Sequence, residues 1–156
     1  MLMNEVIIRK ATKQDMDTLL QFEQGVIERE RQIDMVINPG KINYYNLPEM
    51  IERNDVEIVV AETGNKPIGC GYARVTNAKH YFTNEQFAYL GFMYVLPEYR
   101  GRGINKKVIE YLKAWAEKQG LKELRLEVYV ENIEAVKAYE KIGFSKNVLE
   151  MRWLIN

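Results

Sequence analysis

The sequence predicts an α/β fold with a mixed central β-sheet. Its elements come in a mixed order: a strand and helices, then an antiparallel run of strands, then helix, strand, helix and strand. The chain has 156 residues, a length at which one domain buries a substantial core. We therefore expect a single domain over residues 1–156, with no internal repeat and no interdomain linker.

The first third of the chain is expected to be mostly helical. Residues 5–8 predict a strand, and residues 12–15 look like a capping box with Asp in the Glu/Gln position. A helical face continues over residues 16–23. A second helix is expected over residues 27–35, before the Asn-Pro-Gly turn, and a short one over residues 48–53.

The remaining elements follow from apolar runs and turn formers. Residues 56–61 and 68–75 predict a hairpin around the turn-rich segment between them, and residues 88–95 predict a further strand after a polar loop. Apolar residues at helical spacing predict a helix from Ile104 that ends at Gly120. The last expected elements are a strand over residues 124–130, a helix over 133–142 and a strand over 149–154.

The stretch Arg100-Gly-Arg-Gly103 joins the strand that ends at Val95 to the next helix. Glycines let the backbone turn tightly and leave its amides uncovered. A helix start adds unpaired N–H groups and the positive end of the helix dipole. Such a turn is suited to binding phosphate or pyrophosphate, and Arg100 and Arg102 add positive charge.

Residues 100–105 resemble the acyl-CoA-binding signature of the GNAT acetyltransferases. That signature is Gln or Arg, any two residues, Gly, any residue, then Gly or Ala. Arg100 and Gly103 match it, whereas Asn105 stands where a small residue is usual. Because Asn105 still offers its backbone amide, we expect slightly looser packing against the pyrophosphate and no loss of binding.

A second segment resembles the family's other signature, which is Asn, Ala three residues on, Tyr four further on, then Gly-Phe. Here these are Asn132, Ala135, Tyr139 and Gly143-Phe144, one helix and one strand after the glycine turn, as in the family. The residues alone make Asn132 a good N-cap and Gly143 a suitable residue after a helix end. Spacing alone favours Tyr139 as a core aromatic.

The resemblance implies the GNAT fold, with helices on both faces of a mixed sheet. In that fold two central parallel strands splay apart, and the pantetheine arm of acyl-CoA lies in the gap. Here those strands are expected over residues 88–95 and 124–130. Backbone groups of Met93 and Val95 are then free to pair with pantetheine as a strand would, and Gly91 lies where a bulge helps to open the gap.

The resemblance also implies transfer of an acetyl group from acetyl-CoA to a primary amine, by direct attack in a ternary complex. Tyr139 matches the family's general acid beside the CoA sulfur, Asn132 is expected near the pantetheine, and the Val95 amide is a candidate to polarise the thioester. The residues expected to contact acetyl-CoA are Met93, Tyr94, Val95, Arg100, Gly101, Arg102, Gly103, Ile104, Asn105, Lys106, Asn132, Ala135 and Tyr139.

The sequence does not identify the base that deprotonates the amine. Many members of the family carry a carboxylate near the position of Phe92, and residues 89–95 contain none. Glu127 is the first substitute, although a solvated or salt-bridged strand residue explains it as well. Glu28 and Glu30 come second, and a water chain suffices for an amine of low pKa.

The amino-acid composition limits which other functions the chain can have. The 22 basic and 22 acidic side chains balance, which gives no support for a nucleic-acid interface or a polybasic membrane patch. With one cysteine and one histidine, no disulfide framework and no metal site is expected. Cys70 is expected to be a buried thiol and His80 a surface residue. With no run near the ~20 apolar residues of a membrane span and no secretory pattern, we expect a cytoplasmic protein.

The acceptor is expected to be a small-molecule or peptide amine of unknown identity. The aromatic residues expected partly in its pocket and partly in the core are Tyr44, Tyr45, Tyr72, Tyr81, Phe82 and Tyr94. A homodimer is compatible with the fold, although the sequence shows no distinct interface.

Two other classes of protein are alternatives to an acetyltransferase. A GNAT-fold module that binds acyl-CoA without transferring it fits the missing carboxylate near Phe92, whereas Tyr139 argues against it. A P-loop nucleotide enzyme is excluded, since Ile-Asn follows Gly103 in place of Lys-Ser or Lys-Thr.

Overall fold

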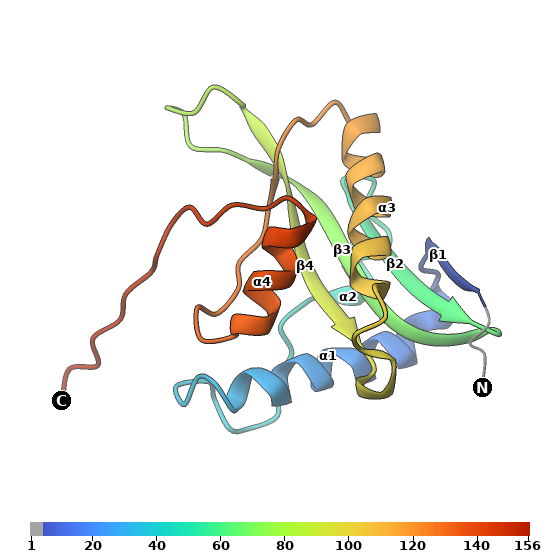
Figure 1. Ribbon diagram of the computed structural model, residues 1–156, viewed down its shortest axis with the longest axis horizontal. Helices are drawn as coiled ribbons and strands as arrows, with labels where there is room; N and C mark the ends of the chain where they lie inside the picture. Colours follow the sequence, from blue (N-terminus) through green and yellow to red (C-terminus); the bar gives the residue numbers. More distant parts are fainter. Residues whose placement is uncertain (1–4) are drawn as a thin grey trace.

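The computed structural model describes residues 5–156, and at its centre is a five-stranded mixed sheet in the order β1-β2-β3-β4-β5 (Figure 1). The strands are β1 (Val6–Lys10), β2 (Val56–Thr63), β3 (Lys66–Asn77), β4 (Gln86–Val95) and β5 (Leu124–Arg125). The first four pair antiparallel with their neighbours, and β4 pairs parallel with β5. The predicted α/β class with a mixed sheet is therefore confirmed.

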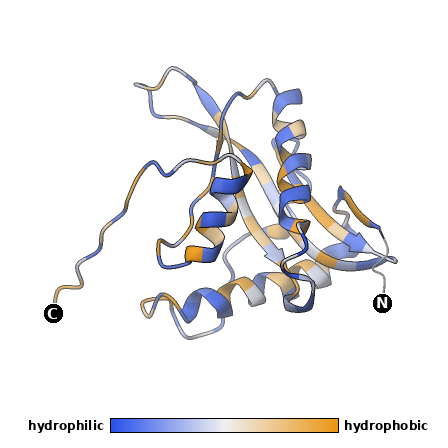
Figure 2. Cartoon of the chain, in the orientation of Figure 1, coloured by the Kyte–Doolittle hydropathy of each residue, from blue (hydrophilic) through white to orange (hydrophobic). Residues whose placement is uncertain are grey.

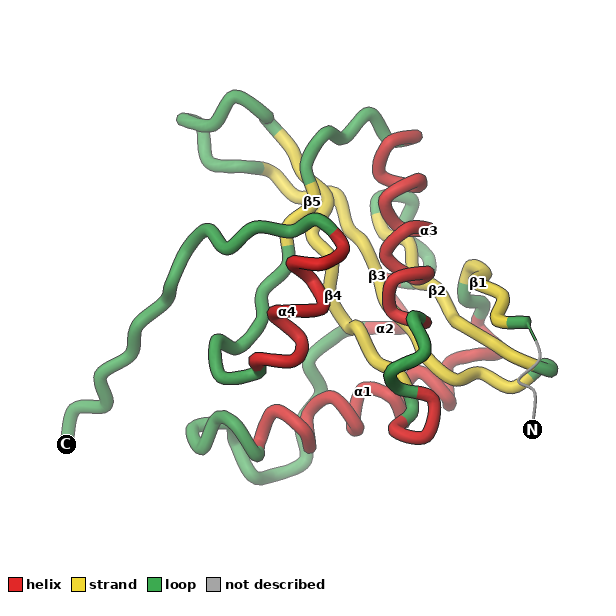
Figure 3. Tube along the Cα trace, viewed as in Figure 1, coloured by secondary structure: helices red, strands yellow, loops and turns green. Residues whose placement is uncertain are grey.

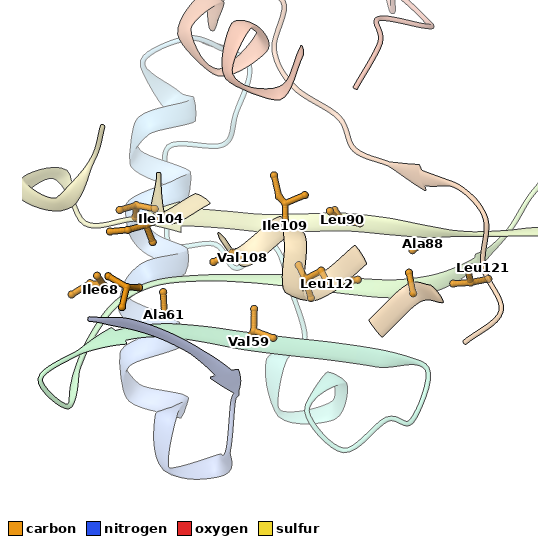
Figure 4. Close-up of a cluster of buried hydrophobic side chains, with 14 residues drawn as sticks. Val59, Ala61, Ile68, Ala88, Leu90, Ile104, Val108, Ile109, Leu112 and Leu121 are labelled. Carbon is orange, nitrogen blue, oxygen red and sulfur yellow. The ribbon is translucent and has the colours of Figure 1, made fainter. Parts of the chain in front are cut away.

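Helices cover both faces of the sheet, as the resemblance implied (Figures 1 and 3). The helices are α1 (Met16–Arg31), α2 (Leu47–Met50), α3 (Ile104–Lys118) and α4 (Ile133–Ile142), with short 3-10 turns η1 (Lys13–Asp15) and η2 (Pro97–Tyr99). The side chains of strand β2 alternate between the two faces of the sheet, so β2 packs against the helices on both faces. Val59 and Ala61 pack in the cluster with α3 (Figure 4), whereas Ile58 and Val60 pack with α1 and α2.

A β-bulge in β4 bends the strand just before the glycine turn. Cys70 of β3 pairs with Tyr94, but Tyr72 pairs with Gly91, so β4 carries an extra residue between these pairs. Phe92 lies in this bulge with φ at 56°, a left-handed conformation that costs a non-glycine residue roughly 1–3 kcal/mol. The bulge lies one residue after Gly91, where the sequence suggested it. Gly91 contributes by leaving room for Tyr72, whose hydroxyl would lie 2.6 Å from a Cβ at that position.

The N-terminal elements differ from the prediction in extent. The first strand continues to Lys10, which pairs with Val59 of β2. The expected second helix over residues 27–35 is the last part of α1, because Ile27 lies on the same buried face as Leu19 and the helix runs unbroken to Arg31. The expected helix over residues 48–53 is the single turn α2.

Two predicted C-terminal strands are wrong in whole or in part. Of residues 124–130, only Leu124 and Arg125 pair with a neighbour, and residues 149–154 form no strand. Residues 145–156 instead leave the body as an extended tail, drawn as a loop in Figure 3. Apolar content predicts a strand, but a strand also needs a hydrogen-bonded neighbour, and the described chain supplies none for these segments.

Candidate active site

Two glycines shape the turn between β4 and α3. Gly101 and Gly103 have φ values of 77° and 75°, in the region that favours glycine. A Cβ on either residue would meet no atom within 4 Å, so the space beside the turn is open. Gly103 is the N-cap of α3, and the first-turn amides of a helix lack partners within it. The turn therefore has the form of an anion-binding nest.

Cationic side chains flank this turn. Arg100 donates a hydrogen bond from Nε to the Val95 carbonyl oxygen at 2.9 Å, and its guanidinium lies 5.7 Å from the centre of the Tyr94 ring. The Arg102 guanidinium lies 5.4 Å from the centre of the Tyr99 ring. Lys106 is exposed in the first turn of α3. The turn thus combines open backbone amides with positive charge.

The end of β4 next to the turn has an open outer edge. Within residues 5–156, β5 pairs with β4 at Ala88 and Tyr89, well before the strand ends. The Tyr94 carbonyl oxygen faces β3, since it would lie 2.7 Å from a Cβ on Gly69. Backbone groups alternate along a strand, so those of Met93 and Val95 face the open edge. This is the splayed arrangement that the resemblance implied.

Tyr139 of α4 reaches the first turn of α3. Asn132 begins α4 as its N-cap and accepts a hydrogen bond from the Ala135 amide at 3.3 Å. Burial raises the pKa of Tyr139, while a hydrogen bond from the Asn105 side chain and the charge of Arg29 lower that pKa by smaller amounts. The predicted general acid therefore packs against the core cluster of the helix that begins at the glycine turn.

Sequence reasoning missed this role of Asn105, to which it gave only a backbone amide. The Asn105 side chain is half-buried, and its Oδ1 atom is buried without a partner in the described part of the chain. The signal was the departure of Asn105 from the small residue that is usual in the motif. The motif alone does not tell which way that side chain points.

The three candidate bases are separated by their surroundings. Glu28 is exposed and lies 3.4 Å from Arg31. Glu30 is half-buried, and burial raises its pKa, while a hydrogen bond from Tyr44 lowers it and the charge of Asp34 raises it. Glu127 is exposed. Burial thus moves the pKa of the Glu30 carboxyl toward neutrality.

The charges of Glu30 and Glu127 both affect the pKa of Tyr89. Burial raises the pKa of Tyr89 to about 12, and the negative charges of Glu127 and Glu30 add to this shift. Burial also raises the pKa of Tyr72, again with a contribution from Glu127. The two carboxylates therefore approach the same region from α1 and from the segment after β5.

The predicted aromatic residues divide into three groups. Tyr44, Tyr45 and Tyr72 gather beside the bulge, with the Tyr45 ring centre 5.4 Å from that of Tyr72 and 5.0 Å from that of Phe92. Tyr94 instead packs on Phe22 of α1, with ring centres 5.1 Å apart. Tyr81 and Phe82 lie together in the polar loop between β3 and β4, remote from the bulge.

Cys70 and His80 are where the sequence predicted them. Cys70 is fully buried in β3, and burial raises the pKa of its thiol. His80 is exposed and lies against Tyr81. Cys70 packs in the same buried cluster as Tyr72 and Phe92, whereas His80 lies in the loop between β3 and β4.

None of the helices within residues 5–156 is long and apolar enough to cross a membrane. No group of three or more His, Cys, Asp or Glu side chains in the same range is arranged to hold a metal ion. A shallow polar hollow lined by Thr83, Asn84, Gln119 and Gly120 lies by the start of β4, at the end of the strand opposite the glycine turn.

Known proteins resemble this chain along most of its length. Residues 24–144 match the Acetyltransferase (GNAT) family. An uncharacterised N-acetyltransferase of Methanocaldococcus jannaschii is 28% identical over 152 residues, which are 94% of this chain and 64% of that protein. The chain thus spans less than two thirds of that relative.

Solved structures share the fold. A mutant of the BH1408 protein from Bacillus halodurans superposes with a TM-score of 0.83 at 19% identity, covering 96% of this chain and 99% of that one. The structure of AAC(6')-Iy in complex with a CoA bisubstrate analogue has a TM-score of 0.73 at 20% identity, covering 98% of this chain and 99% of that one. At these identities the likeness concerns the fold.

Proposed function

The chain belongs to the GNAT acetyltransferase family, and from this premise we propose that it transfers an acetyl group from acetyl-CoA to a primary amine by direct attack in a ternary complex. The observation that carries the proposal is the packing of Tyr139 against the core cluster to which α3 contributes Ile104 and Val108. The tyrosine of the second family signature is thereby close enough to the first turn of α3 for the Asn105 side chain to lower its pKa. We therefore assign the glycine turn, the open outer edge of β4 and the general acid Tyr139 to one continuous site for acetyl-CoA.

Each part of acetyl-CoA has matching groups along this path. The amides around Gly101 and Gly103 suit the pyrophosphate, with Arg100, Arg102 and Lys106 adding charge. The open edge at Met93–Val95 suits the amides of the pantetheine arm, which pair with it as an added strand would. Ile104, Asn105, Asn132 and Ala135, at the starts of α3 and α4, are the further residues that we assign to contact with acetyl-CoA.

We assign Glu30 as the base that takes the proton from the attacking amine, with Glu127 as the second candidate. A base works best when its pKa lies near the operating pH, and burial raises the pKa of Glu30 toward that range. The Tyr44 hydroxyl is close enough to Glu30 to lower the pKa of that carboxyl, against the larger effect of burial. This assignment weakens the alternative of a non-catalytic module, which rested on a missing carboxylate near Phe92.

We assign Tyr139 as the hydrogen-bond donor to the sulfur that leaves. The nitrogen of the amine forms a bond to the acyl carbon, the carbon–sulfur bond breaks, and its electron pair stays on sulfur. A thiol is more acidic than a phenol, so Tyr139 mainly shares its proton with the thiolate. The Val95 amide at the open edge is suited to polarise the acyl oxygen during attack.

The acceptor most compatible with these surroundings is a small molecule carrying a protonated amine. Glu30 and Glu127 attract a cation, and the rings of Tyr45, Tyr72 and Tyr89 favour it further. The solved relative AAC(6')-Iy, which was bound to a CoA–acetylneamine analogue, supports an amine of this kind.

Calorimetric titration with acetyl-CoA, run beside a thiol-release assay on a panel of amines, tests the proposal. Binding with release of CoA by at least one amine is expected. Folded protein that does not bind acetyl-CoA would overturn the assignment of the glycine turn. Binding without turnover across α-amines, diamines, aminosugars and peptides would favour the non-catalytic module.

A further inference from the structure

The loop between α1 and α2, residues 32–46, contains no helix or strand. Loops of this length are uncommon in compact domains, and those that are ordered usually have a function. In Figure 1 the loop leaves the C-terminal end of α1 and returns along that helix toward α2. Figure 2 colours most of this end of α1 as hydrophilic. Polar side chains of α1 are therefore available to hold the loop by hydrogen bonds.

Two of these side chains hold the loop at the surface. Gln24 donates a hydrogen bond from Nε2 to the Ile42 carbonyl oxygen at 3.0 Å. Arg31 donates one from Nη2 to the Asn38 carbonyl oxygen at 2.7 Å. Both bonds are exposed, so water competes for the same groups and the net stabilisation is small. The surface contacts alone do not fix the loop.

Glu23 holds the loop from inside the protein. It is fully buried, and its Oε2 atom accepts hydrogen bonds from the Tyr44 and Tyr45 amides, both at 2.8 Å. Its Oε1 atom is buried and has no partner among residues 5–156. Burying a polar oxygen without a partner costs free energy, so core packing does not account for a glutamate at this position. The two bonds to the loop are what distinguishes Glu23 from an apolar residue.

The two tyrosines that Glu23 holds lie on both sides of the proposed acceptor region. The Tyr44 hydroxyl is close enough to Glu30 to lower the pKa of that carboxyl. The centre of the Tyr45 ring lies 5.0 Å from that of Phe92 in the bulge of β4. Glu23 and Glu30 are seven residues apart, about two turns, and therefore lie on one face of α1. The loop is thus fixed to one glutamate of α1 by its backbone and meets the other with a side chain.

We propose that Glu23 is a positioning residue for the transfer reaction, which fixes Tyr44 and Tyr45 and thereby sets where the acceptor amine lies relative to Glu30. The inference rests on the proposed function, in which Glu30 takes the proton of the amine. Because Glu23 is fully buried, it acts through the two tyrosines and does not contact the amine. Without it, Glu30 stays in place on α1 while the tyrosines around it are released.

Kinetics of Glu23→Leu test this role. The variant keeps an apolar side chain in the core and removes the acceptor of both amides. We expect kcat/KM for the amine to fall by roughly 10²-fold, as small misplacements away from the reacting atoms can produce. The Kd for acetyl-CoA in calorimetry should stay the same, because other elements form the glycine turn and the open edge of β4. Glu23→Gln keeps an oxygen acceptor and should recover most of the activity.

Glu57→Leu is the matched control. Glu57 is a nearly buried glutamate on the opposite face of the sheet, where the Tyr111 hydroxyl of α3 donates a hydrogen bond to it at 3.2 Å. The same substitution there should change Tm but neither kcat/KM for the amine nor the Kd for acetyl-CoA. An equal fall of kcat/KM in both leucine variants, or an unchanged kcat/KM in Glu23→Leu, would overturn the proposal.

Amide hydrogen exchange on the full chain tests the clamp without turnover. The Tyr44 and Tyr45 amides should exchange faster in Glu23→Leu than in the wild type, Glu23→Gln or Glu57→Leu. Unchanged exchange of both amides in Glu23→Leu would overturn the proposal. A wild-type chain that acetylates no amine would remove the proposed function and this inference with it. An active wild type beside an equally active Glu23→Leu would overturn the inference alone.

Discussion

Replacing Asn105 with alanine separates catalysis from stability. Asn105→Ala restores the small residue that is usual at this motif position and leaves the backbone of the glycine turn unchanged. It removes the hydrogen bond that lowers the pKa of Tyr139. It also removes the buried Oδ1 atom, which has no partner among residues 5–156. Activity and stability should therefore respond differently.

The expected loss of activity follows from the kind of hydrogen bond. A neutral hydrogen bond contributes about 0.5–1.5 kcal/mol and one to a charged group about 1.5–3 kcal/mol. Tyr139 gains partial negative charge when it shares its proton with the leaving sulfur. The loss therefore lies between these ranges, at about 1–2 kcal/mol, or roughly 5–30-fold in kcat. The free energy of unfolding should fall by less than about 1 kcal/mol, because an unpaired buried acceptor disappears with the side chain.

Steady-state kinetics against pH and urea unfolding measure both quantities. Without the Asn105 hydrogen bond, the pKa of Tyr139 rises further, so the alkaline limb of kcat should move to higher pH. In a Tyr139→Phe background, Asn105→Ala should have no further effect on kcat, because the partner of the hydrogen bond is already gone. An unchanged kcat and alkaline limb in Asn105→Ala, or an equal loss in the Tyr139→Phe background, would refute this reasoning.

Three further predictions concern the turn, the base and the N-terminal ion pair. Gly103→Val should abolish acetyl-CoA binding in calorimetry, since a branched side chain is strained at positive φ and fills the open space beside the turn. Normal affinity for acetyl-CoA in this variant would contradict the assignment of the turn as the anion site. Glu30→Gln should lower kcat by roughly 10²–10⁴-fold and abolish the acidic limb of the pH profile of kcat. Glu127→Gln is the matched comparison. A larger loss of kcat in Glu127→Gln would mean that Glu127, and not Glu30, is the base. Two hydrogen bonds from Arg9 lower the pKa of Asp15 in the folded protein. The pair therefore stabilises the fold fully when the pH is above about 3.9, the ordinary pKa of Asp. This stabilisation is lost as the pH falls through the lowered pKa of the folded state. The difference in Tm between wild type and Asp15→Asn should then shrink in acid, and a difference that grows on acidification would contradict the assignment.

Local patterns in the sequence determined the elements whose signals are local. The apolar run over residues 56–61 predicts a strand, and β2 contains it; the structure adds that this strand is buried on both faces. The glycine turn sets the start of α3, and Asn132 sets the start of α4, because capping and positive φ involve neighbours a few residues apart. The class of fold followed from the order of these elements.

The tertiary structure alone decided which distant side chains meet. Glu28 and Glu30 are the same type of residue two positions apart, but about half a turn of α1 leaves Glu28 exposed and Glu30 half-buried. Asn105 reaches Tyr139 only because α3 and α4 pack on the same face of the sheet. Residues 149–154 have the composition of a strand, yet no neighbour among residues 5–156 pairs with them. Burial, side-chain direction and strand pairing depend on partners far away in the sequence, which no local pattern records.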